Sequence, residues 1–195
     1  MAGKGDARRE TLVAAAAVAF WERGYAATSL ADVAHSAEVP VGTVFYYFKT
    51  KAALALAVAD VFVSETETLI AEAAGSSEEP RQRIRYLLQR LGQSSRSRME
   101  KGCPISAAIR DFRKPAPKAS QRAAESFERL IGFMARELQK IGLRPSLALA
   151  RARAITAEWQ GGIALAHAFS DMTVLAESLR RTELALMQPV ANRAE

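Results

Sequence analysis

Apolar residues recur at helical spacing along most of the chain, and this periodicity limits the possible folds more than any other feature. Positions three and four residues apart share one face of an α-helix. Such faces occur over residues 12–20, 54–69 and 127–141. No segment alternates polar and apolar residues as a half-buried strand does. Alanine is the commonest residue, and it loses least on entering a helix. The sequence therefore predicts an all-α fold.

The composition excludes several classes of protein. The chain has 195 residues, 49% apolar and 25% charged, so it can bury a sizeable core and does not resemble a disordered chain. No apolar stretch approaches the roughly 20 residues that cross a bilayer. The single cysteine, Cys103, excludes a disulfide framework and a cysteine-rich metal site. We therefore expect a soluble protein of the reducing cytoplasm, without a metal or cofactor.

The sequence lacks the patterns that carry catalysis. Its two histidines, His35 and His167, are widely separated, and it contains neither an HExxH pair nor a glycine-rich phosphate loop. We therefore do not expect an enzyme.

The most specific pattern lies in residues 24–51. Gly24 suits the left-handed position that ends a helix. Thr28 or Ser29 suits the N-cap of the next helix, because Asp32 follows Ser29 at the spacing of a capping box. The sequence thus predicts a long first helix followed by a short second one.

A third helix follows after a short turn. Residues 37–39 suit the turn, and Pro40 suits the first position of a helix. We expect Phe45 and Phe48 to pack inside a small three-helix core. Two short helices braced by a longer one predict a helix-turn-helix over about residues 29–48.

A helix of this kind enters the major groove of DNA with small and polar residues forward, while flanking side chains donate to phosphates. The leading residues of the third helix, the two tyrosines that follow and the nearby hydroxyl and ammonium groups meet this requirement. The candidate DNA contacts are Thr28, Ser29, Val41, Gly42, Thr43, Tyr46, Tyr47, Lys49 and Lys51.

These residues resemble the TetR family of bacterial transcriptional regulators. The family pattern is matched at Gly24-Tyr25, Thr28–Ala34, Ala37–Val39 and Thr43–Lys51, and the match covers about 55 residues. Two positions depart from it. Phe45 stands where the family usually has a tyrosine that can bind a phosphate, and Tyr47 stands where histidine is common. The hydroxyl of Tyr47 is a possible substitute for the one that Phe45 lacks.

The resemblance implies two domains with about nine helices in total: a DNA-binding domain over residues 1–50 and an effector-binding and dimerisation domain over 51–195. It implies a repressor that binds a palindromic operator as a homodimer and is released by a small organic effector. The apolar faces of the last two predicted helices support association independently. The pair Gly161-Gly162 has two interpretations, a close approach between subunits or packing within one chain.

Aromatic, sulfur-containing and imidazole side chains of the C-terminal region suit an apolar ligand, although each also suits a plain core. The candidates are Cys103, Phe112, Phe127, Met134, Trp159, His167 and Phe169. Cys103 has a further interpretation, because Arg98 and Lys101 precede it and nearby cations make a thiol more reactive. The alternative function is therefore a thiol- or electrophile-responsive repressor triggered through Cys103; the alternative role of Cys103 is that of a small buried apolar residue.

The positive charge lies away from the predicted DNA-binding segment. The net charge is +6, yet residues 1–54 carry six basic and five acidic side chains. Residues 55–80 carry six acidic and no basic side chains, and residues 81–122 carry twelve basic and two acidic ones. We expect the basic segment 81–122 to form a solvated face; the alternative is a surface that binds nucleic acid without sequence preference.

Overall fold

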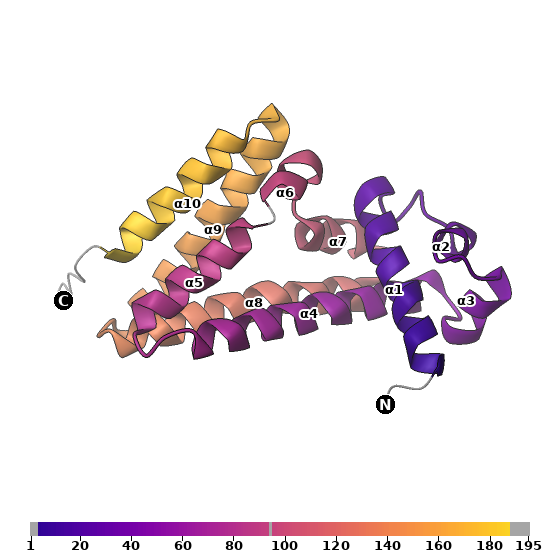
Figure 1. Ribbon diagram of the computed structural model, residues 1–195, viewed down its shortest axis with the longest axis horizontal. Coiled ribbons are helices and arrows are strands. Elements are labelled where there is room, and N and C mark those ends of the chain that lie inside the picture. Colours follow the sequence, from indigo (N-terminus) through magenta and orange to yellow (C-terminus); the bar gives the residue numbers. More distant parts are fainter. Residues whose placement is uncertain (1–3, 94, 188–195) are drawn as a thin grey trace. The chain divides into compact units, whose positions relative to one another are not determined.

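The computed structural model describes residues 4–93 and 95–187, and every regular element in these two ranges is an α-helix (Figure 1). The predicted all-α fold is confirmed. The ten helices of the described ranges are α1 (Lys4–Arg23), α2 (Leu30–Ser36), α3 (Val41–Tyr47), α4 (Lys51–Gly75), α5 (Pro80–Gly92), α6 (Ser95–Lys101), α7 (Pro104–Phe112), α8 (Pro117–Lys140), α9 (Pro145–Phe169) and α10 (Met172–Met187). The short α6 lies where the sequence is rich in polar and helix-breaking residues.

The chain divides into two compact units, which we describe separately. The first contains residues 1–64 and 104–125, and the second contains residues 65–103 and 126–195. This division differs from the boundary expected at residue 50. The reason is that the first half of α4 and all of α7 share a core with α1, so these segments group with the helix-turn-helix.

Three aromatic rings hold α7 to α1 in the first unit. The ring of Phe112 packs edge-on against Phe20, with centroids 5.7 Å apart, and against Tyr25 at 5.2 Å. Phe112 is fully buried. Such tilted pairs stabilise beyond the area that they bury. Phe112, expected in an effector pocket, is therefore a core residue of the first unit.

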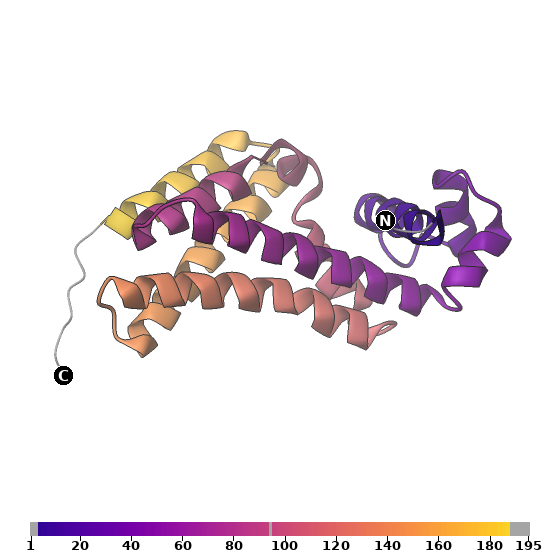
Figure 2. The ribbon, with the colours of Figure 1, turned by 60° about the horizontal axis from the view of Figure 1, so that its bottom comes forward.

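In the second unit, α9 and α10 lie side by side (Figure 2). Gly162 makes the close approach possible, because a Cβ at this position would lie 2.6 Å from the Cβ and Oγ of Ser178. The Ser178 hydroxyl donates to the Glu158 carbonyl at 2.7 Å. Gly161 is exposed, and a Cβ there would meet nothing within 4 Å. Gly162 thus serves packing within the chain, whereas Gly161 does not.

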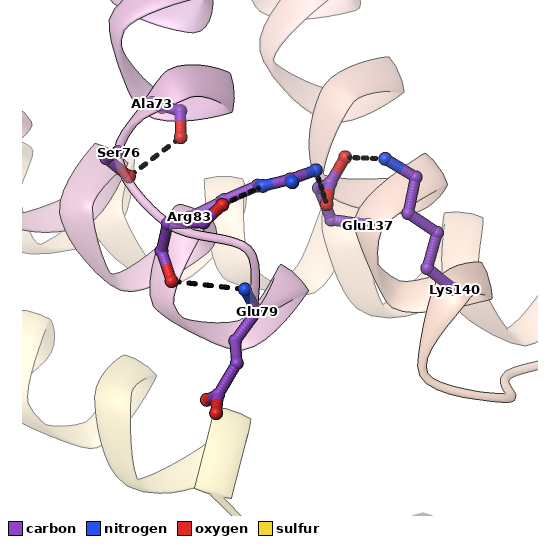
Figure 3. Close-up of polar contacts among 7 residues, drawn as sticks. Ala73, Ser76, Glu79, Arg83, Glu137 and Lys140 are labelled. Atoms are coloured by element: carbon purple, nitrogen blue, oxygen red, sulfur yellow. Dashed lines mark hydrogen bonds and ion pairs between the residues drawn. The ribbon is translucent and has the colours of Figure 1, made fainter.

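A buried carboxylate joins the start of α5 to the end of α8, also in the second unit (Figure 3). Glu137 is 3% exposed. Its Oε2 lies 3.3 Å from Arg83 Nη1, and its Oε1 accepts from Lys140 Nζ at 2.6 Å. Arg83 Nε also donates to the Ser77 carbonyl at 2.6 Å. Because both carboxylate oxygens are paired with cations, the charge is compensated where water is excluded.

Gly162→Ala is expected to destabilise the protein by about 1–3 kcal/mol, because the added methyl group would overlap Ser178 in a buried contact. Gly161→Ala is the matched control, and it should stabilise α9 by about 0.5–1 kcal/mol, the usual gain when alanine replaces a helical glycine. Urea unfolding at one protein concentration compares the two midpoints. A Gly162→Ala midpoint at or above that of the wild type would contradict the close contact.

Candidate nucleic-acid interface

The second helix begins at a complete capping box, as the sequence predicts. Ser29 is the N-cap of α2, and its side chain accepts from the Asp32 backbone amide at 3.1 Å. The Asp32 carboxylate in turn accepts from the Ser29 amide at 2.7 Å. These hydrogen bonds to Ser29 hold the pKa of Asp32 below its usual value. The start of α2 is therefore locally defined.

The turn between α2 and α3 differs from the prediction by one residue. Pro40 is the N-cap of α3 and not its first helical residue. The turn is closed by the Val39 amide, which donates to the Ala34 carbonyl at 3.0 Å, and Glu38 adopts the left-handed conformation with φ of 53°. This conformation reverses the chain and sets α3 on α2.

Helix α3 is anchored by two side chains and presents the others outward. Val44 and Phe48, four residues apart, are 0% and 3% exposed. Phe45 is 48% exposed, which corrects the expectation that it packs inside. The reason is geometric, because the residue after Val44 is turned about 100° around the helix. Tyr46 is 74% exposed.

Most of the expected DNA contacts on α3 lie at the surface. Val41, Gly42 and Lys49 are exposed, and Thr43 is half-buried. Tyr47 is partly buried, with its ring at a right angle to that of Tyr46 and the centroids 4.9 Å apart. We call the outward-facing set on this helix the α3 face; it consists of the exposed Val41, Gly42, Phe45 and Tyr46 and of the half-buried Thr43.

Thr28 does not lie as expected for a phosphate contact. Its side chain is 1% exposed. The hydroxyl donates to the Gly24 carbonyl at 2.9 Å and to the Ala19 carbonyl at 3.2 Å. Thr28 therefore closes the α1–α2 loop onto α1. Ser29, the next residue, is exposed.

Lys51 has a similar structural role, which also corrects the prediction. Its Nζ donates to the Tyr25 carbonyl at 2.7 Å and to the Thr28 carbonyl at 2.9 Å, and it lies 4.2 Å from the Tyr25 ring centroid. Partial burial lowers the pKa of the Lys51 ammonium. Of the two lysines after α3, it is Lys49 that extends into solvent.

The candidates for effector binding do not form one group. Cys103, Met134 and Trp159 are buried in the second unit, Phe127 is half-buried, and Phe112 lies in the core of the first unit. The expectation for His167 is a hydrogen-bonded core residue. It is hydrogen-bonded, with Nδ1 2.8 Å from the Met99 carbonyl, but it is exposed. Phe169 is 67% exposed.

The structure adds a residue that the sequence pattern does not single out as a ligand contact, Arg98 of α6. Its guanidinium carbon lies 5.1 Å from the ring centroid of Trp159, and its Nη1 donates to the Leu91 carbonyl. Burial lowers the pKa of Arg98. Nearby, Cys103 Sγ lies 3.7 Å from Gln160 Nε2. We call Arg98, Cys103, Trp159 and Gln160 the α6–α9 cluster.

Two donors of this cluster are buried without an acceptor in the described residues. They are Nε of Arg98 and Nε1 of Trp159. A buried donor normally has a partner, because leaving it unsatisfied costs about 1–3 kcal/mol. The two atoms are therefore hydrogen-bond donors whose capacity is unmet within the described residues. No pattern in the sequence indicates this, since Arg98 lies in the polar run SRSRMEK.

No helix within residues 4–93 and 95–187 could span a lipid bilayer. The same residues contain no group of three or more His, Cys, Asp or Glu side chains arranged to bind a metal ion.

Comparisons with known proteins agree with this geometry. Residues 12–58 match the family described as bacterial regulatory proteins, tetR family, and residues 80–180 match the C-terminal domain of LmrA/YxaF-like transcriptional regulators. The chain is 31% identical over 175 residues to an HTH-type transcriptional regulator of Mycobacterium tuberculosis, covering 86% of this chain and 88% of that protein.

Solved structures show the same fold. A TetR transcriptional regulator from Legionella pneumophila superposes with a TM-score of 0.81 at 19% identity, over 95% of this chain and 98% of that one. The reduced form of Escherichia coli NemR gives 0.73 at 23% identity, over 90% and 95%. The chain therefore belongs to the TetR family of transcriptional regulators, with an N-terminal helix-turn-helix DNA-binding domain and a C-terminal effector-binding domain.

Proposed function

We propose that this protein is a repressor of the bacterial cytoplasm that binds a palindromic operator as a homodimer and is released by a small organic effector. The observation that carries the proposal is the α3 face, where a large aromatic side chain such as Tyr46 is 74% exposed although a buried core lies directly behind it. Neighbouring exposed apolar and aromatic side chains mark an interaction surface, and a major groove accepts such side chains.

The contacts divide by chemistry. The α3 face is placed to read base edges, and Phe45 and Val41 offer apolar contact to thymine methyl groups. Lys49, which is exposed, is placed to bind a phosphate, with Tyr47 as a further donor. Ser29 is also exposed, but its amide and hydroxyl donate to the Asp32 carboxylate, so it contributes chiefly by capping α2 beside the DNA. Thr28 and Lys51 support these contacts indirectly, by fixing the α1–α2 loop.

The homodimer is supported by apolar side chains on the outer faces of the last two helices. Leu165 is 49% exposed and Leu184 54% exposed, and the same helices expose Leu147, Leu149, Phe169 and Met172. Large apolar patches on a soluble protein mark interaction surfaces. Two helices from each copy would form a four-helix interface. A two-fold dimer matches the symmetry of a palindromic operator.

The effector site is proposed at the α6–α9 cluster of the second unit. The unsatisfied donors of Arg98 and Trp159 favour an aromatic or apolar molecule that carries a carboxylate or carbonyl group. Release from DNA needs only that the effector binds more tightly to the conformation with low operator affinity.

The alternative trigger is covalent modification of Cys103. It is favoured by the two cations that precede Cys103 in the sequence, Arg98 and Lys101, and by the likeness to NemR, whose structure is known in a reduced form. Against it stands the burial of Cys103, which is 6% exposed.

DNA binding is tested by fluorescence anisotropy on duplexes from the region upstream of the protein's own gene. Tyr46→Ala should weaken specific binding tenfold or more, the usual effect of about 1–3 kcal/mol for a base-reading contact. Lys49→Ala removes one phosphate contact from each subunit of the dimer, so the slope of log K against log[salt] should fall by about two. Arg136→Ala, which removes an exposed cation on α8 outside the proposed dimer interface, is the control and should change neither quantity. Equal affinity of wild type and Tyr46→Ala would contradict the proposed role of the α3 face.

Dimerisation is tested by sedimentation equilibrium. The wild type should have twice the 21.2 kDa mass of one chain, and the double variant Leu165→Glu/Leu184→Glu should sediment as a monomer because it buries two charges in the interface. Phe45→Glu provides the matched control, since it changes an equally exposed apolar residue on the DNA-facing helix. A monomeric wild type would refute the homodimer.

The two triggers are separated by N-ethylmaleimide, because Cys103 is the only cysteine of the chain. An effector-gated repressor should keep its operator affinity within about twofold after treatment, since the thiol is buried. Release by the reagent in the wild type, abolished in Cys103→Ser, would instead favour the covalent trigger.

A further inference from the structure

The first unit has a hollow whose lining is strongly basic. Its open volume is about 760 Å³. The lining comes from the end of α1 and the α1–α2 loop, from the start of α4, and from the end of α7 with the following loop. The lining side chains include five cations and one carboxylate, namely Arg23, Lys51, Arg110, Arg113, Lys114 and Asp111. Three of the cations belong to the basic segment 81–122.

The carboxylate is already engaged. Asp111 Oδ1 accepts from Arg110 Nε at 2.8 Å, and its Oδ2 lies 3.5 Å from the backbone amide of Tyr25. Lys51 is likewise committed, to the carbonyls of the α1–α2 loop. Arg110 and Lys51 are therefore already paired within the protein and are not free to bind a ligand.

Three cations of the hollow remain. Arg23, Arg113 and Lys114 are exposed, and within the described ranges none of them forms an ion pair or a hydrogen bond through its side chain. Other basic residues of segment 81–122 are neutralised by the acidic segment before it, as in Arg122–Asp60 at 2.7 Å and Arg90–Glu72 at 3.1 Å. Like charges left together around one hollow repel each other, and an anion between them would relieve this repulsion.

Phosphate suits this set of groups. Guanidinium forks bind phosphate oxygens with paired hydrogen bonds, and an ammonium adds a point charge. The hollow adjoins the proposed DNA contacts along the chain, because Ala26 and Ala27 of its lining immediately precede Thr28 and the exposed Ser29. A DNA strand beside Ser29 has further phosphates on either side of that position.

We propose that Arg23, Arg113 and Lys114 form a phosphate-binding site, and that the phosphates are those of the DNA backbone beyond the bases that α3 reads. The proposal rests on the proposed DNA binding by the α3 face. It assigns a role to basic side chains that the helix-turn-helix does not contain. The segment 104–125 that carries Arg113 and Lys114 lies in sequence between two stretches of the effector-binding unit.

The double variant Arg113→Ala/Lys114→Ala tests the site through the salt dependence of operator binding. Removing one phosphate contact lowers the slope of log K against log[salt] by about 0.9, and the double variant removes two contacts from each subunit of the proposed dimer, so the slope should fall by roughly 3.6. The ratio of operator to scrambled-duplex affinity should stay unchanged, because phosphates carry no sequence information. The matched control is Arg96→Ala/Arg136→Ala, which removes the same charge from exposed positions on α6 and α8, outside the proposed dimer interface. Unchanged thermal midpoints establish that both variants fold.

Pyrophosphate, titrated calorimetrically into the protein without DNA, separates the two sources of phosphate. One outcome would overturn the DNA assignment in favour of a free phosphorylated ligand. In that outcome the double variant keeps the salt slope of the wild type, and pyrophosphate binds to the wild type but not to Arg113→Ala/Lys114→Ala. If both double variants have the same salt slope and the same affinity for pyrophosphate as the wild type, the three cations do not form a phosphate site. Failure of the proposed function looks different, because Tyr46→Ala would then bind the operator as the wild type does.

Discussion

The loop between α1 and α2 positions the helix-turn-helix of the first unit, and Lys51 fixes this loop. From the start of α4, its ammonium joins the carbonyls of Tyr25 and Thr28, while the Tyr25 ring packs against Phe112 of α7. The loop leads directly to Ser29, which caps α2, and α2 carries α3. The sequence predicts that the Lys51 ammonium binds DNA. In the structure this ammonium instead holds the loop that leads into the helix-turn-helix.

Much of the helix-turn-helix can be predicted because its signals are local. The left-handed glycine after α1, the capping box of α2 and the inward spacing of Val44 and Phe48 depend on residues within one or two turns of each other. The roles of Thr28 and Lys51 cannot, since their partners include carbonyls up to 26 residues away in sequence. Phe45 is misplaced for a related reason: its aromatic character alone does not distinguish the buried face of a two-turn helix from the face beside it.

The helices of the second unit can be predicted from the sequence, but the residues that form its candidate effector site cannot. Periodicity gives each apolar face, yet it does not say which helices those faces meet, so it groups Phe112 with Trp159 although the two belong to different units. Arg98 shows the opposite error. It lies in a polar run that suggests a surface helix, and only the packing of α6 on α9 buries its guanidinium against Trp159. Unsatisfied donors are a property of the packed chain, which a pattern of residue types does not contain.

The contact between Gly162 and Ser178 sets the axial register of α9 and α10. Sliding α9 by one turn would bring Glu158 or Ala166 opposite Ser178, and either residue carries a Cβ where there is space only for a hydrogen atom. The contact therefore excludes a slip of one helical turn in either direction. In the proposed dimer, the heights of Leu165 and Leu184 relative to each other are thus fixed before two copies meet, and association need not select among offset arrangements.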